Sequence, residues 1–310
     1  MLHRRSGTYK NWHNTPLFPK GACYVITVGS NAWQAAHGRS LKLDGRGRIM
    51  AIVNATPDSF SDGGRYLAID AAFSHALTCV EEGADIIDIG GESTRPGAAA
   101  VTEAEEQDRV LPVIEKLRRE TDALISIDTY RASTARLAIA AGAHIVNDVF
   151  GLQKDPDMAG VVAAFRAGVC IMHTGRDRQK LADVIKDQFE FLDRSLEIAD
   201  NAGISREAVV LDPGFGFAKD EEENVALMAR FGELSAFGLP VLAGTSRKRF
   251  IGSLTGRDSA ADRDIGTAAT TVVLRLAGAA VFRVHNVAAT RDALAIADAV
   301  LAKTTAKADA

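Results

Sequence analysis

Polar and ionisable residues recur in this chain just after short apolar runs. The run ADIIDIG, residues 84–90, is followed directly by GGESTRPGA, residues 91–99, which places a carboxylate, two hydroxyls and an arginine between glycines. These are poor core residues, and the flanking glycines give the backbone a freedom that a plain connector rarely needs. The stretch is therefore predicted to contact a polar ligand.

A polar residue also follows each of the other apolar runs. The residues at these positions are Asn54, Asp88, Glu92, Asp128, Asn147, Asp148, His173, Asp212, Ser246, Arg247, Lys248, Arg283 and His285. One or two of them would be explained as helix caps. Polar residues at the ends of eight runs favour one shared site.

This set offers two kinds of chemistry. Amide, carboxylate and ammonium groups suit the edge of a nitrogen-rich heterocycle, and the residues of this kind are Asn54, Asp128, Asn147, Asp212 and Lys248. Cationic and hydroxyl groups suit a phosphate or a carboxylate, and these are Arg95, Arg283, His285, Ser93 and Thr94.

Several of these residues have an equally plain structural interpretation. Asp88 and Asp148 serve as well in structural hydrogen bonds as in ligand contacts, and His173 alone is more typical of a packed or backbone-bonded histidine than of a ligand. Arg247 and Lys248 are adjacent, so one side chain is expected to face outward when the other faces the site. Their spacing does not decide which one.

The apolar runs are predicted strands, and each is followed by an Ala/Leu/Glu-rich stretch with helical periodicity. The predicted strands cover 49–54, 84–90, 123–129, 144–149, 169–173, 208–214, 239–244 and 281–285. The predicted helices cover 69–82, 103–119, 131–141, 157–167, 180–202, 221–231, 263–277 and 288–302. Alternation of this kind predicts parallel strands joined by helices.

Eight strand and helix units over about 250 residues predict an α/β fold, a (β/α)8 TIM barrel spanning residues 49–303. A doubly wound open sheet is the alternative, but no GxGxxG follows the first strand. Residues 1–48, with Trp12, Trp33 and the run CYVITV, are expected to form an N-terminal extension or a plug across the barrel bottom, and 304–310 a flexible tail. In a barrel, the polar strand ends meet at one face.

Composition excludes several partners. The net charge is −4 at pH 7, so no overall basic field attracts nucleic acid or an anionic membrane. The three cysteines are far apart and have no metal-ligand spacing, which argues against a disulfide framework or a zinc site. With no signal peptide or membrane span recognisable, we expect a cytoplasmic protein that acts on small molecules.

Seven motifs, in order along the predicted barrel, resemble those of the dihydropteroate synthases of folate biosynthesis. They are IVNATPDSFSDGG, GGESTRPGA, SIDTYRA, VND, LDPGFGFAK, GTSRKRFIG and FRVHN. Corrinoid-linked methyltetrahydrofolate methyltransferases are built on similar pterin-binding barrels, but the ESTRPG and SRK loops favour the synthase. A catalytically silent pterin-binding paralogue is the non-enzyme alternative.

The resemblance implies a transferase that condenses 6-hydroxymethyl-7,8-dihydropterin diphosphate with 4-aminobenzoate and releases pyrophosphate. It implies that Asp128, Asn147, Asp212 and Lys248 hold the pterin, that Asn54 helps to bind Mg²⁺, and that Thr94, Arg283 and His285 meet the diphosphate. For the aminobenzoate pocket it implies Arg95, Pro96, Phe60, Asp62, Phe217 and Ser246. It further implies a sulfonamide target and a homodimer.

The implied mechanism is departure of diphosphate followed by attack of the amine on a dihydropterin cation. An aromatic amine is neutral near pH 7 and needs no strong base, so we expect no His/Asp dyad. The chain departs from the usual pattern at TGRDRQ after His173, at Ala218 before Lys219 in place of glycine, and at Arg131 in place of lysine. These departures lie outside the implied pterin set and bear on the loops.

Overall fold

The computed structural model describes residues 32–55, 65–92 and 101–305. Within them, an eight-stranded parallel sheet runs in the order β8-β7-β6-β5-β4-β3-β10-β9. Its strands are β3 (Arg48–Asn54), β4 (Ile86–Gly90), β5 (Leu124–Asp128), β6 (Ile145–Asp148), β7 (Gly168–Met172), β8 (Val209–Asp212), β9 (Leu242–Ala243) and β10 (Val281–Val284). A bridge between Leu211 and Val241 joins β8 to β9 and closes the barrel. The open-sheet alternative is therefore excluded.

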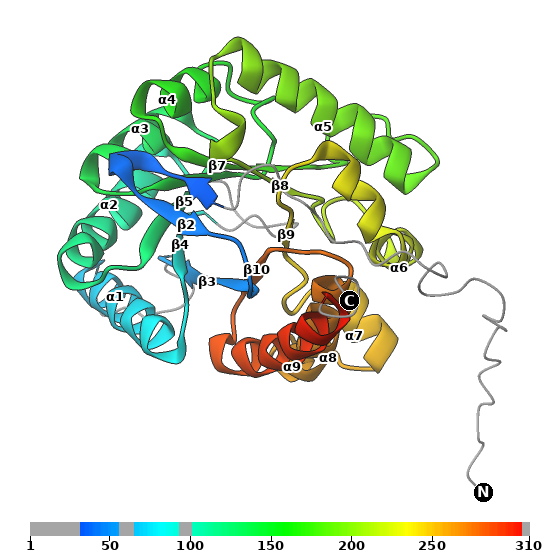
Figure 1. Ribbon diagram of the computed structural model, residues 1–310. Coiled ribbons are helices and arrows are strands. Elements are labelled where there is room, and N and C mark those ends of the chain that lie inside the picture. The colour runs from blue at the N-terminus through cyan, green and yellow to red at the C-terminus, as the bar shows by residue number, and fades with distance from the viewer. Residues whose placement is uncertain (1–31, 56–64, 93–100, 306–310) are drawn as a thin grey trace, which may run out of the picture.

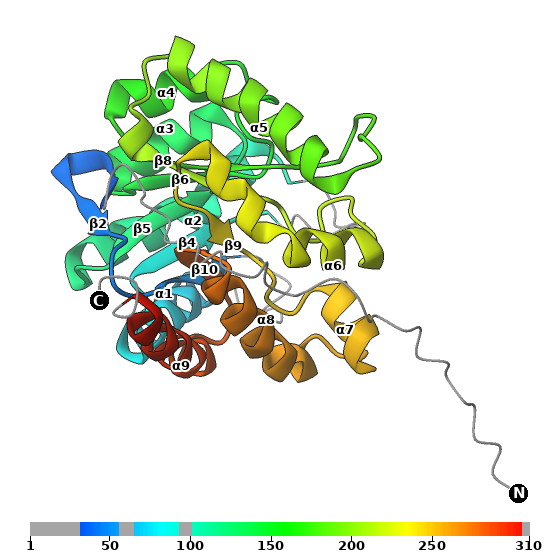
Figure 2. The same ribbon diagram turned by 45° about the vertical axis from the view of Figure 1, so that its right-hand side comes forward.

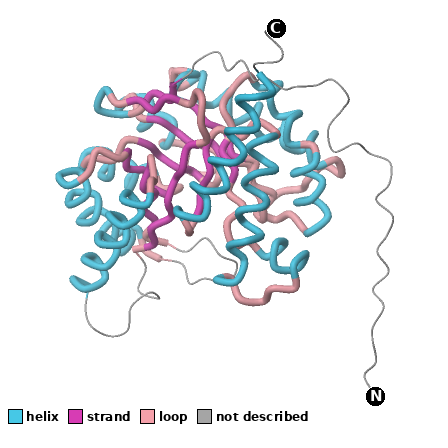
Figure 3. Tube along the Cα trace, turned by 60° about the horizontal axis from the view of Figure 1, so that its bottom comes forward, coloured by secondary structure: helices cyan, strands magenta, loops and turns pink. Residues whose placement is uncertain are grey.

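Helices surround the strands in chain order (Figure 1; Figure 3). They are α1 (Arg65–Glu82), α2 (Glu103–Glu120), α3 (Ala132–Ala141), α4 (Met158–Phe165), α5 (Val184–Asn201), α6 (Glu221–Ala229), α7 (Arg249–Thr255), α8 (Asp264–Leu276) and α9 (Val287–Thr305). The predicted (β/α)8 architecture is confirmed. The short helix α7 was not predicted, and α5 begins later than expected because Asp183 caps it by accepting hydrogen bonds from the amides of Ile185 and Lys186.

One apolar side chain from each strand fills the lower part of the barrel. These residues are Met50, Ile86, Leu124, Ile145, Cys170, Val210, Leu242 and Val281, and all are buried. Successive side chains alternate between the two faces of a strand, so residues two positions further along face the interior again. This periodicity decides which side chains can reach the site.

The β-hairpin of β1 (Ala32–Gln34) and β2 (Ser40–Lys42) covers the end of the barrel where the parallel strands begin, drawn in blue at the left of Figure 2. Trp33 is fully buried against the apolar layer, and its indole N–H donates to the carbonyl of Ala208 at 2.9 Å. Residues 32–43 thus form the plug that the sequence suggested. The helix α9 extends to Thr305 and so includes the first two residues of the predicted tail 304–310. Trp12 and the rest of that tail lie outside the described residues.

Candidate active site

A polar layer lies two residues beyond the apolar layer, at the carboxyl ends of the strands. Strand alternation turns Asp88, Ser126, Asn147, Asp212 and Arg283 into the barrel from β4, β5, β6, β8 and β10. In barrels of this kind, the carboxyl ends of the strands carry the site. The sequence periodicity therefore brings residues from five strands to one mouth.

Arg283 is the centre of the polar layer. It donates from Nε to Asp88 Oδ2 at 2.7 Å and from Nη2 to Asp128 Oδ2 at 2.6 Å. Asn147 donates from Nδ2 to the same Asp88 oxygen at 3.0 Å. We call Asp88, Asp128, Asn147 and Arg283 the mouth cluster. Asp88 was open between a structural and a ligand role, and these contacts give its Oδ2 atom a structural one.

Three polar atoms of this layer are buried and have no hydrogen-bond partner among the described residues: Asp88 Oδ1, Asp128 Oδ1 and Ser126 Oγ. A buried acceptor with no partner costs free energy, and such groups are uncommon in native proteins. The described residues thus leave acceptors available to a ligand that carries N–H donors.

The charge balance of the mouth cluster is incomplete, because one guanidinium faces two carboxylates. Burial raises the pKa of Asp128 to about 7; Arg283 opposes this rise and Asp88 adds to it. Burial alone would lower the pKa of Arg283, but Asp88 and Asp128 outweigh it and raise that pKa. We conclude that the arginine stays charged while Asp128 titrates near neutral pH.

On the other side of the mouth, Lys248 is held by the turn that follows β8. Its ammonium donates to the carbonyl of Phe215 and lies 4.6 Å from the centroid of the Phe217 ring. Burial lowers the pKa of Lys248 to about 8, and Asp212 opposes the shift. Burial likewise raises the pKa of Asp212, against the field of Lys248. Asp212 and Lys248 are thus an electrostatically coupled pair.

Ser246 and His285 are joined at the ends of β9 and β10. The backbone N–H of His285 donates to Ser246 Oγ at 3.1 Å, and this oxygen lies 2.9 Å from His285 Nδ1. Arg247 turns away and pairs with Asp264 of α8 at 2.7 Å. Lys248 is therefore the member of the Arg247–Lys248 pair that faces the mouth.

Asn54 is exposed at the end of β3. A Cβ built at Gly90 on the neighbouring strand would lie 3.8 Å from both Asn54 Oδ1 and Asp128 Oδ2. The absence of a side chain at Gly90 thus keeps space between the amide and the carboxylate. Within the described ranges, no group of three or more His, Cys, Asp or Glu residues is placed to hold a metal ion.

Arg131 holds the two described residues that flank segment 93–100. Its Nη1 donates to Glu92 at 2.6 Å and to Glu106 at 2.9 Å, while Nη2 donates to the carbonyl of Val101 at 2.8 Å. Six predicted site residues lie outside the described residues: Phe60, Asp62, Ser93, Thr94, Arg95 and Pro96.

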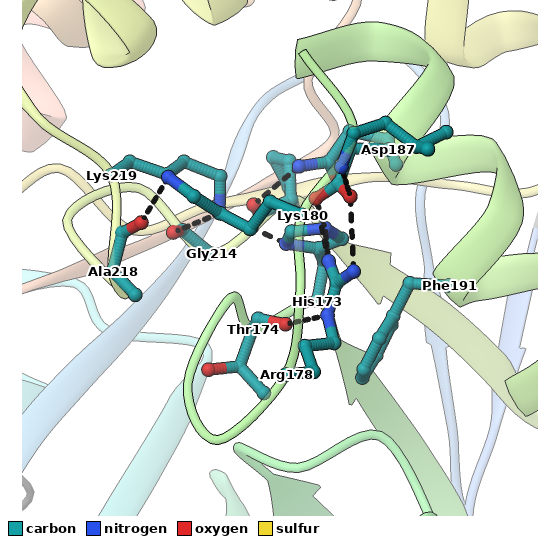
Figure 4. Close-up of polar contacts among 12 residues, drawn as sticks. His173, Thr174, Arg178, Lys180, Asp187, Phe191, Gly214, Ala218 and Lys219 are labelled. Carbon is teal, nitrogen blue, oxygen red and sulfur yellow. Dashed lines mark hydrogen bonds and ion pairs between the residues drawn. The ribbon is translucent and has the colours of Figure 1, made fainter. Parts of the chain in front are cut away.

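A second polar cluster at the same end of the barrel went unrecognised in the sequence. His173 Nε2 lies 2.9 Å from Asp187 Oδ2, and Nδ1 lies 2.9 Å from Lys219 Nζ (Figure 4). The expectation of no His/Asp dyad concerned a general base for the amine, and it stays a prediction. His173 and Asp187 are both buried, at 0% and 2% exposure, so neither side chain contacts solvent in the mouth.

The expectation that His173 is packed or backbone-bonded is only partly right. Its ring packs edge-on against Phe191, with the centroids 5.0 Å apart, but its ring nitrogens meet side chains. Asp148, the other open case, accepts hydrogen bonds from the amides of Phe150 and Leu152, both at 2.8 Å. Asp148 is thus a structural residue.

Fold and site together define a closed (β/α)8 barrel with a polar mouth and available buried acceptors, a class that contains many enzymes. The family model of pterin binding enzymes matches residues 50–285. The chain therefore belongs to the pterin-binding enzyme family, in the branch of the dihydropteroate synthases, which are transferases. The resemblance inferred from the motifs is confirmed.

Among its relatives, the dihydropteroate synthase of Bacillus subtilis is 45% identical over 255 residues, covering 82% of this chain and 89% of that protein. The Xanthomonas albilineans synthase solved with 4-aminobenzoic acid superposes with a TM-score of 0.83 at 47% identity, covering 87% of this chain and 98% of the other. The same synthase in complex with 7,8-dihydropteroate superposes with a TM-score of 0.79 at 44% identity, covering 86% and 98%.

Among the described residues, no helix combines the length and apolar character needed to cross a membrane.

Proposed function

We propose that this chain condenses 6-hydroxymethyl-7,8-dihydropterin diphosphate with 4-aminobenzoate to give 7,8-dihydropteroate and pyrophosphate. The observation that carries the proposal is the pair of unpartnered buried oxygens, Asp88 Oδ1 and Asp128 Oδ1, beside Asn147 in the mouth. The edge of an aminopyrimidine ring presents several N–H donors in a row. Such an edge would satisfy the acceptors that the folded chain leaves unpaired.

The pterin would lie between the mouth cluster and the pair of Asp212 and Lys248. Carboxylates of Asp128 and Asp212 favour positive charge on the dihydropterin, which develops as the carbon–oxygen bond to diphosphate breaks. Arg283 and His285 would stabilise the departing diphosphate, with Ser246 orienting the imidazole through its hydroxyl. These residues act mainly by electrostatics, because a neutral aromatic amine attacks without prior deprotonation. After the carbon–nitrogen bond forms, the nitrogen would lose its extra proton to water or to the departing pyrophosphate.

Mg²⁺ is part of the proposal. Magnesium is commonly held by one or two protein oxygens together with substrate phosphates and water, so the exposed amide oxygen of Asn54 beside Asp128 fits this mode. When bound, the ion would neutralise charge on the leaving diphosphate.

A homodimer and a cytoplasmic location complete the proposal. The helices α8 and α9 expose Ile265, Ile296 and Val300 at 85%, 66% and 50%, which supports self-association through this face. Sedimentation velocity of the parent and of Ile265→Asp tests the dimer. The location rests on the composition, and cell fractionation tests it.

Pyrophosphate release tests the activity, with each substrate supplied alone and then together, with and without Mg²⁺. Release that requires both substrates, and competition between sulfonamides and 4-aminobenzoate, are the expected results. Binding of pterin without release would instead indicate a silent paralogue. Methyl transfer from methyltetrahydrofolate to a cobalamin acceptor would indicate the corrinoid-linked enzymes.

A further inference from the structure

A buried polar network connects β7, α5 and the turn after β8. It consists of His173, Arg178, Asp187 and Lys219, and we call it the β7–β8 network (Figure 4). Arg178 donates from Nη1 to Asp187 Oδ1 at 2.9 Å and from Nη2 to Asp187 Oδ2 at 2.5 Å, and its Nε donates to the carbonyl of Thr174 at 2.8 Å. Asp187 is thereby tied to the loop that follows β7.

The partners of His173 decide its tautomer. Two side chains meet Nε2, because Asp187 Oδ2 and Arg178 Nη2 both lie 2.9 Å from it, while Lys219 Nζ lies 2.9 Å from Nδ1. The guanidinium of Arg178 already donates to both oxygens of Asp187, so we assign the proton to Nε2, which donates to Asp187 Oδ2 and leaves Nδ1 to accept from Lys219. Burial lowers the pKa of His173 to about 4, although the hydrogen bond that the ring donates to Asp187 opposes this shift, so the ring is neutral at pH 7. Asp187 thus orients His173, and His173 presents a fixed acceptor to Lys219.

Lys219 connects this acceptor to the turn Pro213–Lys219. Its ammonium donates to the carbonyl of Gly214 at 2.9 Å, and the same carbonyl accepts from the amide of Phe217 at 3.1 Å. Gly214 has φ +65°, and a Cβ there would lie 1.9 Å from the carbonyl oxygen of His173, so the turn packs directly on the end of β7. Only glycine fits this position.

Two residues of the turn Pro213–Lys219 hold Lys248. The carbonyl of Phe215 accepts from the Lys248 ammonium, and the Phe217 ring lies 4.6 Å from it. The guanidinium of Arg176 lies 4.6 Å from the same ring. A displacement of the turn would therefore move the ammonium of Lys248 relative to the mouth.

Stability does not account for Lys219. Lys219 is 8% exposed, and its two hydrogen bonds go to a carbonyl and a neutral imidazole, so no carboxylate pairs with it directly. Asp212 and Asp187 favour its cation from a distance and do not offset burial. Burial, together with the field of Lys248, lowers the pKa of Lys219 to about 7. An apolar side chain of similar length would avoid this cost.

We propose that Lys219, oriented by Asp187 through His173, is a positioning residue for pterin binding: it fixes the turn Pro213–Lys219 so that Phe215 and Phe217 hold the Lys248 ammonium at the mouth. The inference rests on the proposed function, because it assigns Lys248 to the pterin site. It predicts that loss of Lys219 weakens binding while the stability of the fold is kept or increased.

Lys219→Met tests this inference, with Lys116→Met, the same change in an exposed ion pair with Asp70, as the matched control. Pteroic acid is the probe, and its dissociation constant is measured by calorimetry beside the thermal midpoint. We expect the dissociation constant to rise by about 10- to 100-fold, the effect of a small misplacement of a binding group, with an unchanged or higher midpoint. The control stays within about twofold of the parent, as expected for a surface pair.

A dissociation constant of Lys219→Met within twofold of the parent would overturn the inference, and so would weaker binding that merely follows a lower midpoint. If this variant does not fold, His173→Asn and His173→Gln replace it, because Asn keeps an acceptor near the Nδ1 position and Gln does not. Weaker binding by Gln than by Asn supports the inference, and equal binding overturns it.

The proposed function has a separate readout. A parent protein that binds pteroic acid but releases no pyrophosphate from the two substrates would sink the proposed activity and leave the binding comparison intact. A parent that binds no pteroic acid would overturn both.

Discussion

The mouth cluster and the β7–β8 network are two groups of buried charged residues at the same end of one barrel, and they differ in how completely they are hydrogen-bonded. In the network, each carboxylate oxygen of Asp187 accepts two hydrogen bonds, from Arg178 and Leu181 at Oδ1 and from Arg178 and His173 at Oδ2. In the mouth cluster, Asp88 and Asp128 each keep one buried oxygen that no other described residue contacts by a hydrogen bond.

The pKa shifts record the same difference. Burial alone would raise the pKa of both Asp187 and Asp128. Hydrogen bonds from His173 and Arg178 outweigh burial at Asp187 and lower its pKa, whereas the single shared Arg283 leaves the pKa of Asp128 raised. Burial of charge is therefore not what marks a binding site. Among the described residues, a buried carboxylate oxygen that has no hydrogen-bond donor is the better indicator.

Removing a charge from the mouth should have the largest effect. Lys248→Ala is expected to lower kcat/KM by about a thousandfold, the scale of losing one electrostatic contact to the reacting groups. The fold should be kept but the thermal midpoint should fall somewhat, because the buried Asp212 and the carbonyl of Phe215 lose the ammonium. Steady-state pyrophosphate release and differential scanning calorimetry give the two values. Near-parental turnover in this variant would remove Lys248 from the site.

Replacing one aspartate of the mouth cluster and one of the β7–β8 network by asparagine compares the two groups directly. Asp187→Asn should reduce the free energy of unfolding by about 3 kcal/mol, because it leaves the Arg178 cation without its compensating charge. Asp128→Asn should change it by less than about 1 kcal/mol, because Asp88 still pairs with Arg283, yet lower turnover about a hundredfold. Urea unfolding and kinetics of the two variants check this. Equal stability losses would abolish the distinction between the clusters.

The pH dependence of binding should reveal the titration of Asp128. N–H donors of a pterin favour the carboxylate, and the free site has a pKa of about 7 at Asp128. A proton must therefore leave on binding, so the affinity for pteroic acid should rise on the order of tenfold between pH 5.5 and 7.5 and then level off. Calorimetry in buffers of different ionisation enthalpy would detect the released proton. Asp128→Asn should flatten this profile, and an unaltered slope in that variant would assign the titration elsewhere.

Strand periodicity allowed much of the mouth to be predicted from the sequence. Once Ile145 and Val210 point into the barrel, Asn147 and Asp212 two residues later must do so as well. No such periodicity links His173 to Asp187, because the aspartate lies on an outer helix and meets the histidine only when α5 packs on β7. Which atoms stay unpaired depends likewise on tertiary geometry.

Arg131 belongs to neither the mouth cluster nor the β7–β8 network, and its substitution should give the smallest of the predicted effects. Its guanidinium bonds Glu92, Glu106 and the carbonyl of Val101 at once, and so holds both flanks of segment 93–100. A lysine has one compact ammonium and cannot reproduce this fork. Arg131→Lys should therefore raise KM for 4-aminobenzoate about fivefold, equivalent to about 1 kcal/mol, with kcat nearly unchanged.

Arg109→Lys is the matched control for Arg131→Lys. Arg109 donates from Nη1 to the carbonyl of Gly91 at 2.9 Å, a single contact that a lysine can replace. The KM of the Arg109→Lys variant for 4-aminobenzoate should stay within about twofold of the parent value. Equal KM values in the two variants would show that the three-way fork of Arg131 has no part in substrate binding. A fall in kcat for Arg131→Lys would extend its influence from the segment flanks to the reacting groups.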